Sequence, residues 1–347
     1  MEETLSASLG IEEGAFFTLR ERVKWLYDSY GQRKPMGIPA PSTKRPHYFL
    51  HRTFLNQNDL LIIFNTLSCR YSCSFCSLSS KSSSLPVPGD CILAQFGYVV
   101  EELKHSLSVL DRITLSNEGS VLDARTFPQS ALLEIASCIS ELRRIHILVL
   151  ETRIEFVDPV FVRRIMKRAP RVMVDILTGF ETLDSRIRDE ILGKKEPLGV
   201  FLNGLDKVKQ LRSALTCFVL YKPDPVMTDE EAFVEAEKSI DFLGRECEKR
   251  SIPLTIRLNP MYMAKGSQWA RRARSIPTYQ PPRLTDVMRL AEKKVEEGMS
   301  VYIGLSTEGL NAHGGSYVCR EDYSQKLIKP IKLFNDGKIL HFDWERI

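Results

Sequence analysis

Three cysteines lie close together at Cys69, Cys73 and Cys76, with Phe75 just before the last. Thiolates on one short segment bind soft metal ions or iron–sulfur clusters. A structural zinc site and a [4Fe–4S] cluster usually take four protein ligands. Three cysteines therefore predict a cluster with one iron left open for a small ligand. Zinc completed by a distant histidine or cysteine, or three incidental cysteines, are the alternatives.

The cysteine segment follows the run Leu-Leu-Ile-Ile-Phe at 60–64, which is typical of a fully buried strand. A serine-rich loop at 76–84 comes next. The cysteines are therefore expected on the loop that leaves the carboxyl end of a strand. Strand–helix units of α/β enzymes usually carry their chemistry at this position.

From residue 58 the chain alternates between strand-like and helix-like segments. The expected strands are 59–66, 112–117, 145–151, 171–178, 214–221 and 253–260. The expected helices are 95–109, 129–143, 158–168, 181–191, 199–212 and 228–249. This alternation predicts an α/β fold of parallel strands with right-handed crossovers. Six units fall two short of a closed eight-unit barrel, so we expect an open, partial (β/α)6 barrel.

The predicted domain organisation has an N-terminal extension at 1–57, the barrel at 58–275 and a small α/β appendage at 276–347. The basic segment 44–51 is either a lip over the site or, as we favour, a packed surface arm. The appendage is expected to contain a helix at 284–298, a strand at 301–305, a polar loop, and a short strand or tail at 338–344.

Polar residues follow the second expected strand at Asn117, Glu118 and Gly119. Glycine lets the backbone approach a ligand closely, and the other two side chains can bind an ammonium or carboxylate group. The pattern predicts ligand contact, with a capped turn as the alternative.

Glu151 and Arg153 end the third expected strand, and strand alternation places them on the same side. Opposite charges on a buried strand are costly unless they pair or bind a ligand. A carboxylate can bind a ribose diol, and an arginine can bind a carboxylate through two hydrogen bonds. Ligand binding is the prediction, and a structural ion pair is the alternative.

Glu181, Arg257 and Asn259 lie at the ends of later expected strands. The carboxyl ends of parallel barrel strands face one cavity, so these residues are candidates for cosubstrate or substrate contact. Each taken alone could equally have a structural role.

The cysteine motif resembles that of the radical SAM superfamily, in which S-adenosylmethionine binds the open iron of a [4Fe–4S] cluster through its amino and carboxylate groups. The resemblance implies that Asn117, Glu118 and Gly119 occupy the place of the motif that binds the methionine amino group, although the usual Gly-Gly-Glu form is absent. It also implies that Phe75 flanks the adenine.

Other segments narrow the resemblance, which covers roughly residues 58–310. Glu-Thr-Arg at 151–153 and Gly-Phe-Glu-Thr-Leu-Asp at 179–184 are similar to the branch containing the Elongator catalytic subunit. Ser-Val-Leu-Asp at 120–123, together with 258–261 and 265–267, resembles the radical SAM subunit of archaeosine synthase. That relative acts on a 7-deazaguanine base in transfer RNA.

The resemblance implies reductive cleavage of S-adenosylmethionine to a 5′-deoxyadenosyl radical, which abstracts hydrogen from a substrate. It also implies an external one-electron donor such as flavodoxin or ferredoxin. A lone Cys319 replaces the richer cysteine cluster of the RNA-modifying relative, and the Elongator acetyltransferase domain is absent. We therefore favour a small substrate, which includes nucleoside derivatives, over RNA. A non-catalytic iron–sulfur sensor or scaffold is the remaining alternative.

Composition fits a cytoplasmic enzyme. Hydrophobic residues make up 43% of the 347 residues and charged residues 27%, which is ordinary for a globular protein. The eight cysteines suit a reducing compartment, and neither a membrane span nor a signal peptide is evident. A net charge of +4 permits an anionic partner without requiring one. Arg271, Arg272 and Arg274 are the best candidates for phosphate contact if the substrate is a polynucleotide.

Overall fold

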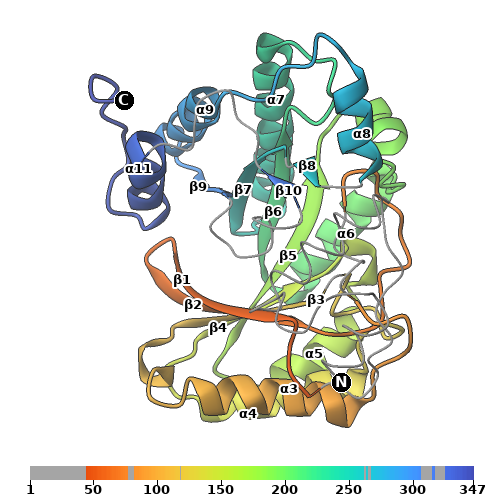
Figure 1. Cartoon of the computed structure of the whole chain (residues 1–347). Coiled ribbons are helices and arrows are strands. Elements are labelled where there is room, and N and C mark those ends of the chain that lie inside the picture. Colours follow the sequence, from red (N-terminus) through yellow and green to blue (C-terminus); the bar gives the residue numbers. More distant parts are fainter. Residues whose placement is uncertain are drawn as a thin grey trace, which may run out of the picture.

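The fold is built on one eight-stranded sheet, as a computed structural model shows (Figure 1). The structure describes residues 44–76, 82–117, 119–261, 263–264, 267–305, 315–316 and 325–347. The strands, in their order across the sheet, are β1 (Tyr48–Phe54), β2 (Gln57–Phe64), β3 (Arg112–Asn117), β4 (Ile147–Glu151), β5 (Met173–Glu181), β6 (Ala214–Tyr221), β7 (Leu254–Pro260) and β9 (Ser300–Ile303). Neighbouring strands from β2 to β9 are parallel, and β1 pairs with β2 in the antiparallel sense.

Helices connect the parallel strands, and a last helix follows β9. They are α3 (Gly89–Glu102), α4 (Gln129–Glu141), α5 (Pro159–Arg168), α6 (Leu198–Leu211), α7 (Asp229–Glu248), α8 (Gln268–Ser275), α9 (Leu284–Glu296) and α11 (Gln325–Asn335). Short helical turns lie at η2 (Leu107–Val109), η3 (Ile154–Phe156) and η4 (Ile187–Ile191), and a small ribbon pairs β8 (Met263–Ala264) with β10 (Gly315–Ser316). None of the helices in the described ranges combines the length and apolar character needed to cross a membrane.

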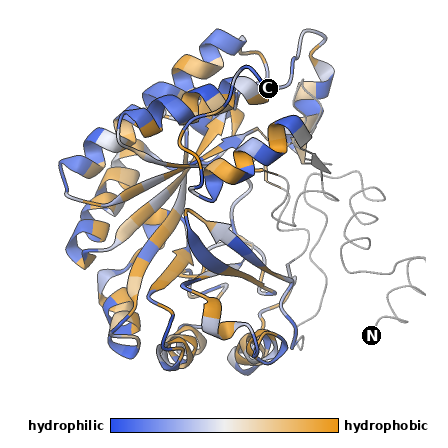
Figure 2. Cartoon of the chain, turned by 90° about the vertical axis from the view of Figure 1, so that its left-hand side faces the viewer, coloured by the Kyte–Doolittle hydropathy of each residue, from blue (hydrophilic) through white to orange (hydrophobic). Residues whose placement is uncertain are grey.

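The main core lies between the sheet and its helices. Leu60, Ile62 and Phe64 alternate along β2 and are fully buried within this core. Figure 2 shows hydrophobic and hydrophilic segments alternating along the helices around the sheet, as expected for helices with one buried face. A smaller apolar cluster, which includes Val149, Leu177 and Phe218, lies on the inner face.

Charged residues fill the inner face at the amino ends of the strands. Asp59 accepts hydrogen bonds from Arg52 at 2.9 Å and from Thr114 at 2.8 Å. Arg112 lies 3.2 Å from the carboxylate of Asp175, and all four charged side chains are nearly or fully buried. Two arginines thus neutralise two aspartates, which limits the cost of burying them. This end of a barrel usually contributes to stability rather than chemistry.

The two edge strands of the curved sheet meet through aromatic side chains and α11. Phe54 of β1 stacks on Tyr302 of β9, with 4.5 Å between the ring centroids. The side-chain amide of Asn335 bonds the backbone N–H and C=O of Ile303 at 2.8 and 2.7 Å, and its own carbonyl accepts from Leu55. The last turn of α11 thus satisfies backbone groups at the edges of the sheet.

The predicted partial barrel is confirmed, and the six expected strands match β2 to β7 within three residues at each end. The helix expected at 181–191 begins later than predicted, because β5 continues to Glu181 and helical structure covers only residues 185–191, ending with the π-turn η4. The helix expected at 95–109 begins earlier, directly after Pro88. Sequence patterns also missed α11, whose Pro330 is unusual inside a helix.

The sheet extends beyond the predicted barrel at both ends. Strand β1 lies inside the predicted extension and β9 inside the predicted appendage, yet both pair with barrel strands. The helix expected at 284–298 is α9, and the segment 338–344 is an irregular tail without strand pairing. The proposed boundaries at residues 57 and 275 stay predictions, and residues 1–43 and the polar loop around 313 lie outside the described residues.

Candidate functional site

The cysteine loop leaves the carboxyl end of β2, as predicted, and all three cysteines are half-buried. Gly119, in the turn after β3, lies directly beside the loop. A Cβ atom on Gly119 would come within 3.3 Å of the Cys69 Cβ atom and 3.4 Å of its Cα atom. This approach is tighter than most Cβ contacts, so a larger residue at 119 would require the Cys69 backbone to shift.

The thiol set fits an iron–sulfur cluster better than a single metal ion. Within the described ranges, no three histidine, cysteine or carboxylate side chains converge closely enough to hold one ion. A single zinc ion requires such convergence, whereas a [4Fe–4S] cluster binds each thiolate at a different iron. The zinc alternative therefore finds no support in this part of the chain.

Arg70, the residue after the first cysteine, holds the loop to the turn that follows β3. Its guanidinium forms a two-pronged contact with Asp123, at 2.9 Å and 2.5 Å. The same guanidinium lies 5.1 Å from the centre of the Phe156 ring. The paired carboxylate and the nearby ring restrict the orientation of this segment.

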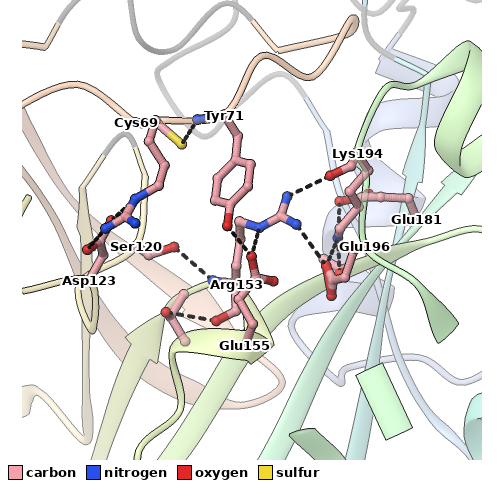
Figure 3. Close-up of polar contacts among 12 residues, drawn as sticks. Cys69, Tyr71, Ser120, Asp123, Arg153, Glu155, Glu181, Lys194 and Glu196 are labelled. Carbon is pink, nitrogen blue, oxygen red and sulfur yellow. Dashed lines mark hydrogen bonds and ion pairs between the residues drawn. The ribbon is translucent and has the colours of Figure 1, made fainter. Parts of the chain in front are cut away.

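Tyr71 holds the loop to the turn that follows β4 (Figure 3). Its hydroxyl donates to Glu155 at 2.5 Å, and the same carboxylate oxygen accepts from Arg153 Nε at 2.9 Å. The Arg153 guanidinium lies 3.8 Å from the centre of the Tyr71 ring. Burial and the Glu155 carboxylate raise the pKa of Tyr71 to about 12, so the phenol is a stable donor at neutral pH.

Ser74 holds the loop to the region after β5. Its hydroxyl donates to the carbonyl of Ile191 at 2.5 Å, and its N–H donates to the carbonyl of Leu192 at 2.6 Å. Its own carbonyl accepts from the backbone N–H of Trp269 at 3.0 Å. Three residues of the cysteine loop are thus bound to three different strand-end regions.

A group of charged residues lies next to this loop. Lys194, Glu181 and Glu196 are buried, and Arg153 and Glu155 are partly buried. Lys194 Nζ lies 3.3 Å from both Glu181 and Glu196, and it also contacts the carbonyl of Gly179. Arg153 lies 3.6 Å from Glu196 and donates to the carbonyl of Lys194 at 3.1 Å. Burial opposes protonation of Lys194, but Glu196 and Glu181 outweigh it and raise its pKa.

Glu196 and Glu181 both show features of a ligand site. Both oxygens of Glu196 are buried and accept no hydrogen bond from a described residue. Glu181 has a left-handed backbone with φ of 72°, which is uncommon outside glycine and recurs at functional sites. Burial raises the pKa of Glu181, although Lys194 opposes this. The site as a whole has two cations and three carboxylates.

Glu151 and Arg153 do not form an ion pair with each other. Burial raises the pKa of Glu151, whereas a hydrogen bond with Ser116 and the charges of Arg257 and Arg52 lower it. Glu151 therefore interacts with groups inside the barrel, whereas Arg153 contacts Tyr71 of the cysteine loop. The structural pair considered from sequence is not what the structure shows.

Arg257 and Asn259 extend the polar interior along β7. The Arg257 guanidinium lies 5.0 Å from the centre of the Phe218 ring and 5.4 Å from that of Tyr302. Asn259 lies against Gly304, where a Cβ atom would clash with its side-chain oxygen. The interior set of Glu151, Arg257 and Asn259 is thus distinct from the charged group at the loop.

The remaining predicted site residues are Asn117, Phe75 and Glu118, and the two that the structure describes have different surroundings. Asn117 is buried, and its amide donates to the hydroxyls of Thr66 and Thr126 at 3.1 and 3.2 Å, so it shapes the turn. Phe75 packs against the apolar cluster around Leu192. Glu118 lies outside the described residues, so its role stays a prediction.

Sequence patterns did not indicate Tyr71, Glu155, Lys194 or Glu196 as part of the site. Their contacts join residues far apart in the chain, such as Tyr71 and Glu155, which are 84 positions apart. The one available signal was the charged Lys-Lys-Glu run at 194–196 between two apolar segments.

Comparisons with known proteins find distant relatives in sequence and in fold. No family model matches the chain. It is 26% identical over 293 residues to an uncharacterized protein of Methanocaldococcus jannaschii, covering 81% of this chain and 76% of that protein. It is 21% identical over 294 residues to archaeosine synthase subunit beta of Thermococcus kodakarensis, covering 82% and 86%.

Solved structures share the fold. Spore photoproduct lyase complexed with a dinucleoside spore photoproduct aligns with a TM-score of 0.50 and 15% identity, over 87% of this chain and 93% of that one. The radical S-adenosylmethionine methyltransferase TsrM of Kitasatospora setae aligns with a TM-score of 0.42 and 12% identity, over 61% of this chain but only 38% of that one. The fold is thus shared with spore photoproduct lyase, and the similarity to archaeosine synthase subunit beta agrees with one of the two relatives that the motifs suggested.

The first prediction concerns the cluster ligands. Replacement of Cys69, Cys73 or Cys76 by alanine should abolish a reconstituted cluster of about four iron and four sulfide per chain, because each thiolate binds a separate iron. Iron and sulfide analysis with electron paramagnetic resonance measures this. Cys138→Ala is the matched control, since Cys138 is exposed on α4. Retention of the cluster in Cys73→Ala would contradict the assignment.

The second prediction concerns Glu151 and Arg153. Glu151→Gln and Arg153→Gln should each weaken S-adenosylmethionine binding by roughly 2–5 kcal/mol, because a charged contact in a buried site is lost. Iron content should stay intact in Glu151→Gln, because Glu151 contacts Ser116 rather than the cysteine loop. Calorimetry on the reconstituted protein measures the affinity, and an unchanged affinity in both variants would leave them purely structural roles.

The third prediction concerns Tyr71. Tyr71→Phe keeps the ring but removes the hydroxyl that donates to Glu155, so it should lower the free energy of unfolding by about 1 kcal/mol. It should also let a chelator remove iron several-fold faster. The pKa of Tyr71 is raised on folding, so the wild-type advantage should be full below pH 10 and decline as pH rises towards 12.

Urea denaturation and iron release to a chelator measure these effects. Tyr98→Phe is the matched control, because Tyr98 lies on α3 and packs against Phe49 and Arg45 rather than against the charged group at the loop. Equal rates of iron release from wild type and Tyr71→Phe would show that this contact does not hold the cysteine loop.

Proposed function

We propose that this protein is a radical SAM enzyme. Cys69, Cys73 and Cys76 would hold a [4Fe–4S] cluster, and the neighbouring charged group would bind S-adenosylmethionine. The observation that carries the proposal is a three-cysteine loop at the carboxyl edge of a partial barrel, tied to three strand-end regions through Arg70, Tyr71 and Ser74. Similarity to archaeosine synthase subunit beta and the shared fold with spore photoproduct lyase support it.

Such a cluster and cosubstrate supply, when bound, a one-electron cleavage of S-adenosylmethionine to methionine and a 5′-deoxyadenosyl radical that removes hydrogen from an unactivated carbon. The chain itself must orient the reacting groups and exclude water. Buried tethers such as the Ser74 bonds suit that role, because they fix the loop without mobile surface side chains.

The charge of the site favours this cosubstrate. Arg153 and Lys194 provide two positive charges, whereas Glu155, Glu181 and Glu196 provide three negative charges when ionised. S-adenosylmethionine has one carboxylate, one ammonium and one sulfonium, so its net charge is positive. A cation of this kind would balance the excess carboxylate, which is otherwise expensive to bury.

The proposed substrate is a small molecule, and a nucleoside derivative is included in this class. The interior side chains Glu151, Arg257 and Asn259 would contact it or the cosubstrate. Their mixture of acceptor, cation and amide suits a compact polar molecule. An external one-electron donor of the flavodoxin or ferredoxin class is part of the proposal.

Modification of transfer RNA is the second candidate function. The similarity to archaeosine synthase subunit beta over 82% of the chain favours it. The modest net charge of +4 and the lack of a recognisable RNA-binding module favour the small substrate. A non-catalytic iron–sulfur sensor is the third reading.

The fourth prediction tests the reaction and its substrate class. Reconstituted protein with dithionite and S-adenosylmethionine should release 5′-deoxyadenosine, and Cys73→Ala should release none. Mass spectrometry should show stimulation by the small-molecule fraction of a cell extract and not by its RNA fraction. No cleavage by a fully loaded protein would favour the sensor. Stimulation by transfer RNA alone, with steeply salt-dependent binding, would favour the RNA-modifying enzyme.

A further inference from the structure

The short helix α8 has a basic face and a buried face. Trp269, Ala270 and Ala273 are buried, whereas Arg271, Arg272 and Arg274 are exposed. None of these arginines forms a salt bridge with a residue in the described part of the chain. Many other basic side chains do, as Arg250 does with Asp206 and Glu246. We call the three arginines the α8 basic face.

The α8 basic face is fixed to the cysteine loop. The backbone N–H of Trp269 donates to the carbonyl of Ser74 at 3.0 Å, and Ser74 follows Cys73 directly. The Trp269 indole N–H donates to the carbonyl of Pro223 at 2.6 Å, and the Ser267 hydroxyl caps the helix. Arg271 and Arg272 lie only two and three residues beyond Trp269. Because helical rise is about 1.5 Å per residue, these arginines stay within a short distance of the loop.

We propose that the α8 basic face is the docking surface for an acidic one-electron carrier protein that reduces the cluster. This inference rests on the proposed function. The proposed reaction consumes one electron for each cleavage, and an external carrier must deliver it. In the delivery step the carrier loses one electron and the oxidised cluster gains it, with no bond formed or broken.

The size and chemistry of the surface suit such a carrier. Redox proteins form small, weak complexes that charge complementarity steers together. Eight residues span about 12 Å of helix, which matches a small contact patch. An acidic carrier would complement three arginines that form no salt bridge with any described residue, and docking there would bring the carrier next to the cysteines proposed to hold the cluster.

RNA is a poorer occupant of the same surface. Sequence-tolerant binding of single strands uses exposed aromatic rings for stacking and a groove that follows many phosphates. The one tryptophan of α8 is 1% exposed and packs edge-on against Tyr279 instead. Three charges on a short helix would neutralise few phosphates. The α8 basic face is therefore assigned to a protein carrier.

The fifth prediction tests this docking surface by stopped-flow measurement of cluster reduction. The probe is flavodoxin hydroquinone, mixed anaerobically with the reconstituted full chain over a range of salt. The variant Arg271→Gln/Arg272→Gln/Arg274→Gln should be reduced at least about 10-fold more slowly at low salt, since electrostatic steering raises association rates by 10–10³. Its rate should also lose most of its salt dependence. Iron content and reduction by photoreduced deazaflavin should match wild type.

The matched control removes the same charge elsewhere. Arg163→Gln/Arg164→Gln/Lys167→Gln neutralises three exposed basic residues on α5, which lies at the opposite end of the molecule from α8 (Figure 1). This variant should be reduced at nearly the wild-type rate. Equal slowing in both variants would attribute the effect to net charge and overturn the docking surface, as would no slowing in the α8 variant.

Two further outcomes separate this inference from the proposed function. A wild-type chain that deazaflavin reduces and that cleaves S-adenosylmethionine, but that flavodoxin hydroquinone and reduced ferredoxin both fail to reduce, would overturn the docking surface alone. A chain that binds no cluster would overturn both. If the α8 variant keeps its flavodoxin-dependent rate but loses transfer RNA in a gel-shift assay, the surface belongs to RNA and the inference is wrong.

Discussion

The guanidinium of Arg153 joins the cysteine loop to the ends of β4 and β5. It stacks against Tyr71, donates to Glu155 at 2.9 Å and reaches the Lys194 carbonyl at 3.1 Å. A single planar cation can satisfy these partners together because its donors form a rigid fork. Without it, two carboxylates near the loop would lose a compensating charge and the loop would lose the surface under Tyr71. The position of the cysteine loop therefore depends on contacts outside its own short segment, and the Arg153–Tyr71 contact is one of them.

Much of the barrel could be predicted from sequence, because buried parallel strands are continuous apolar runs. The bounds of β3 and β6 were predicted to the residue, and each run is buried on the helix-facing side by residues such as Ile113 and Val219. The turn at η4 could not be predicted this way. There the left-handed backbone at Glu181 follows the strand direction no further, and Asp184 accepts from the Ile187 N–H where the helical segment begins. The backbone at Asp184 and the side chain of Glu181 also contact Glu235 and Lys194, which lie far along the chain or beyond the turn.

The site was predictable only where its chemistry is local. Three cysteines within eight residues predict a cluster without further information. The residues that hold the cysteine loop in place, in contrast, come from strand ends far along the chain. The same limit explains Glu151 and Arg153. Strand alternation assumes that both residues belong to the strand, but β4 ends at Glu151 and the chain turns into η3 immediately afterwards. Arg153 therefore lies outside the strand, and its side-chain position is set by its contacts with Tyr71 and Glu155.

The two ends of the barrel treat buried charge in opposite ways. At the amino ends of the strands, Arg52 and Arg112 are balanced by Asp59 and Asp175, and no ligand is needed to make that layer neutral. At the carboxyl ends, the group around Arg153 and Lys194 has one carboxylate in excess, and both oxygens of Glu196 lack a hydrogen bond from the described residues. A buried imbalance of this kind costs stability unless a ligand completes it. The balanced charges thus lie at the amino ends of the strands, which usually contribute to stability. The group with one excess carboxylate lies beside the cysteines, where a bound cationic cosubstrate would restore neutrality.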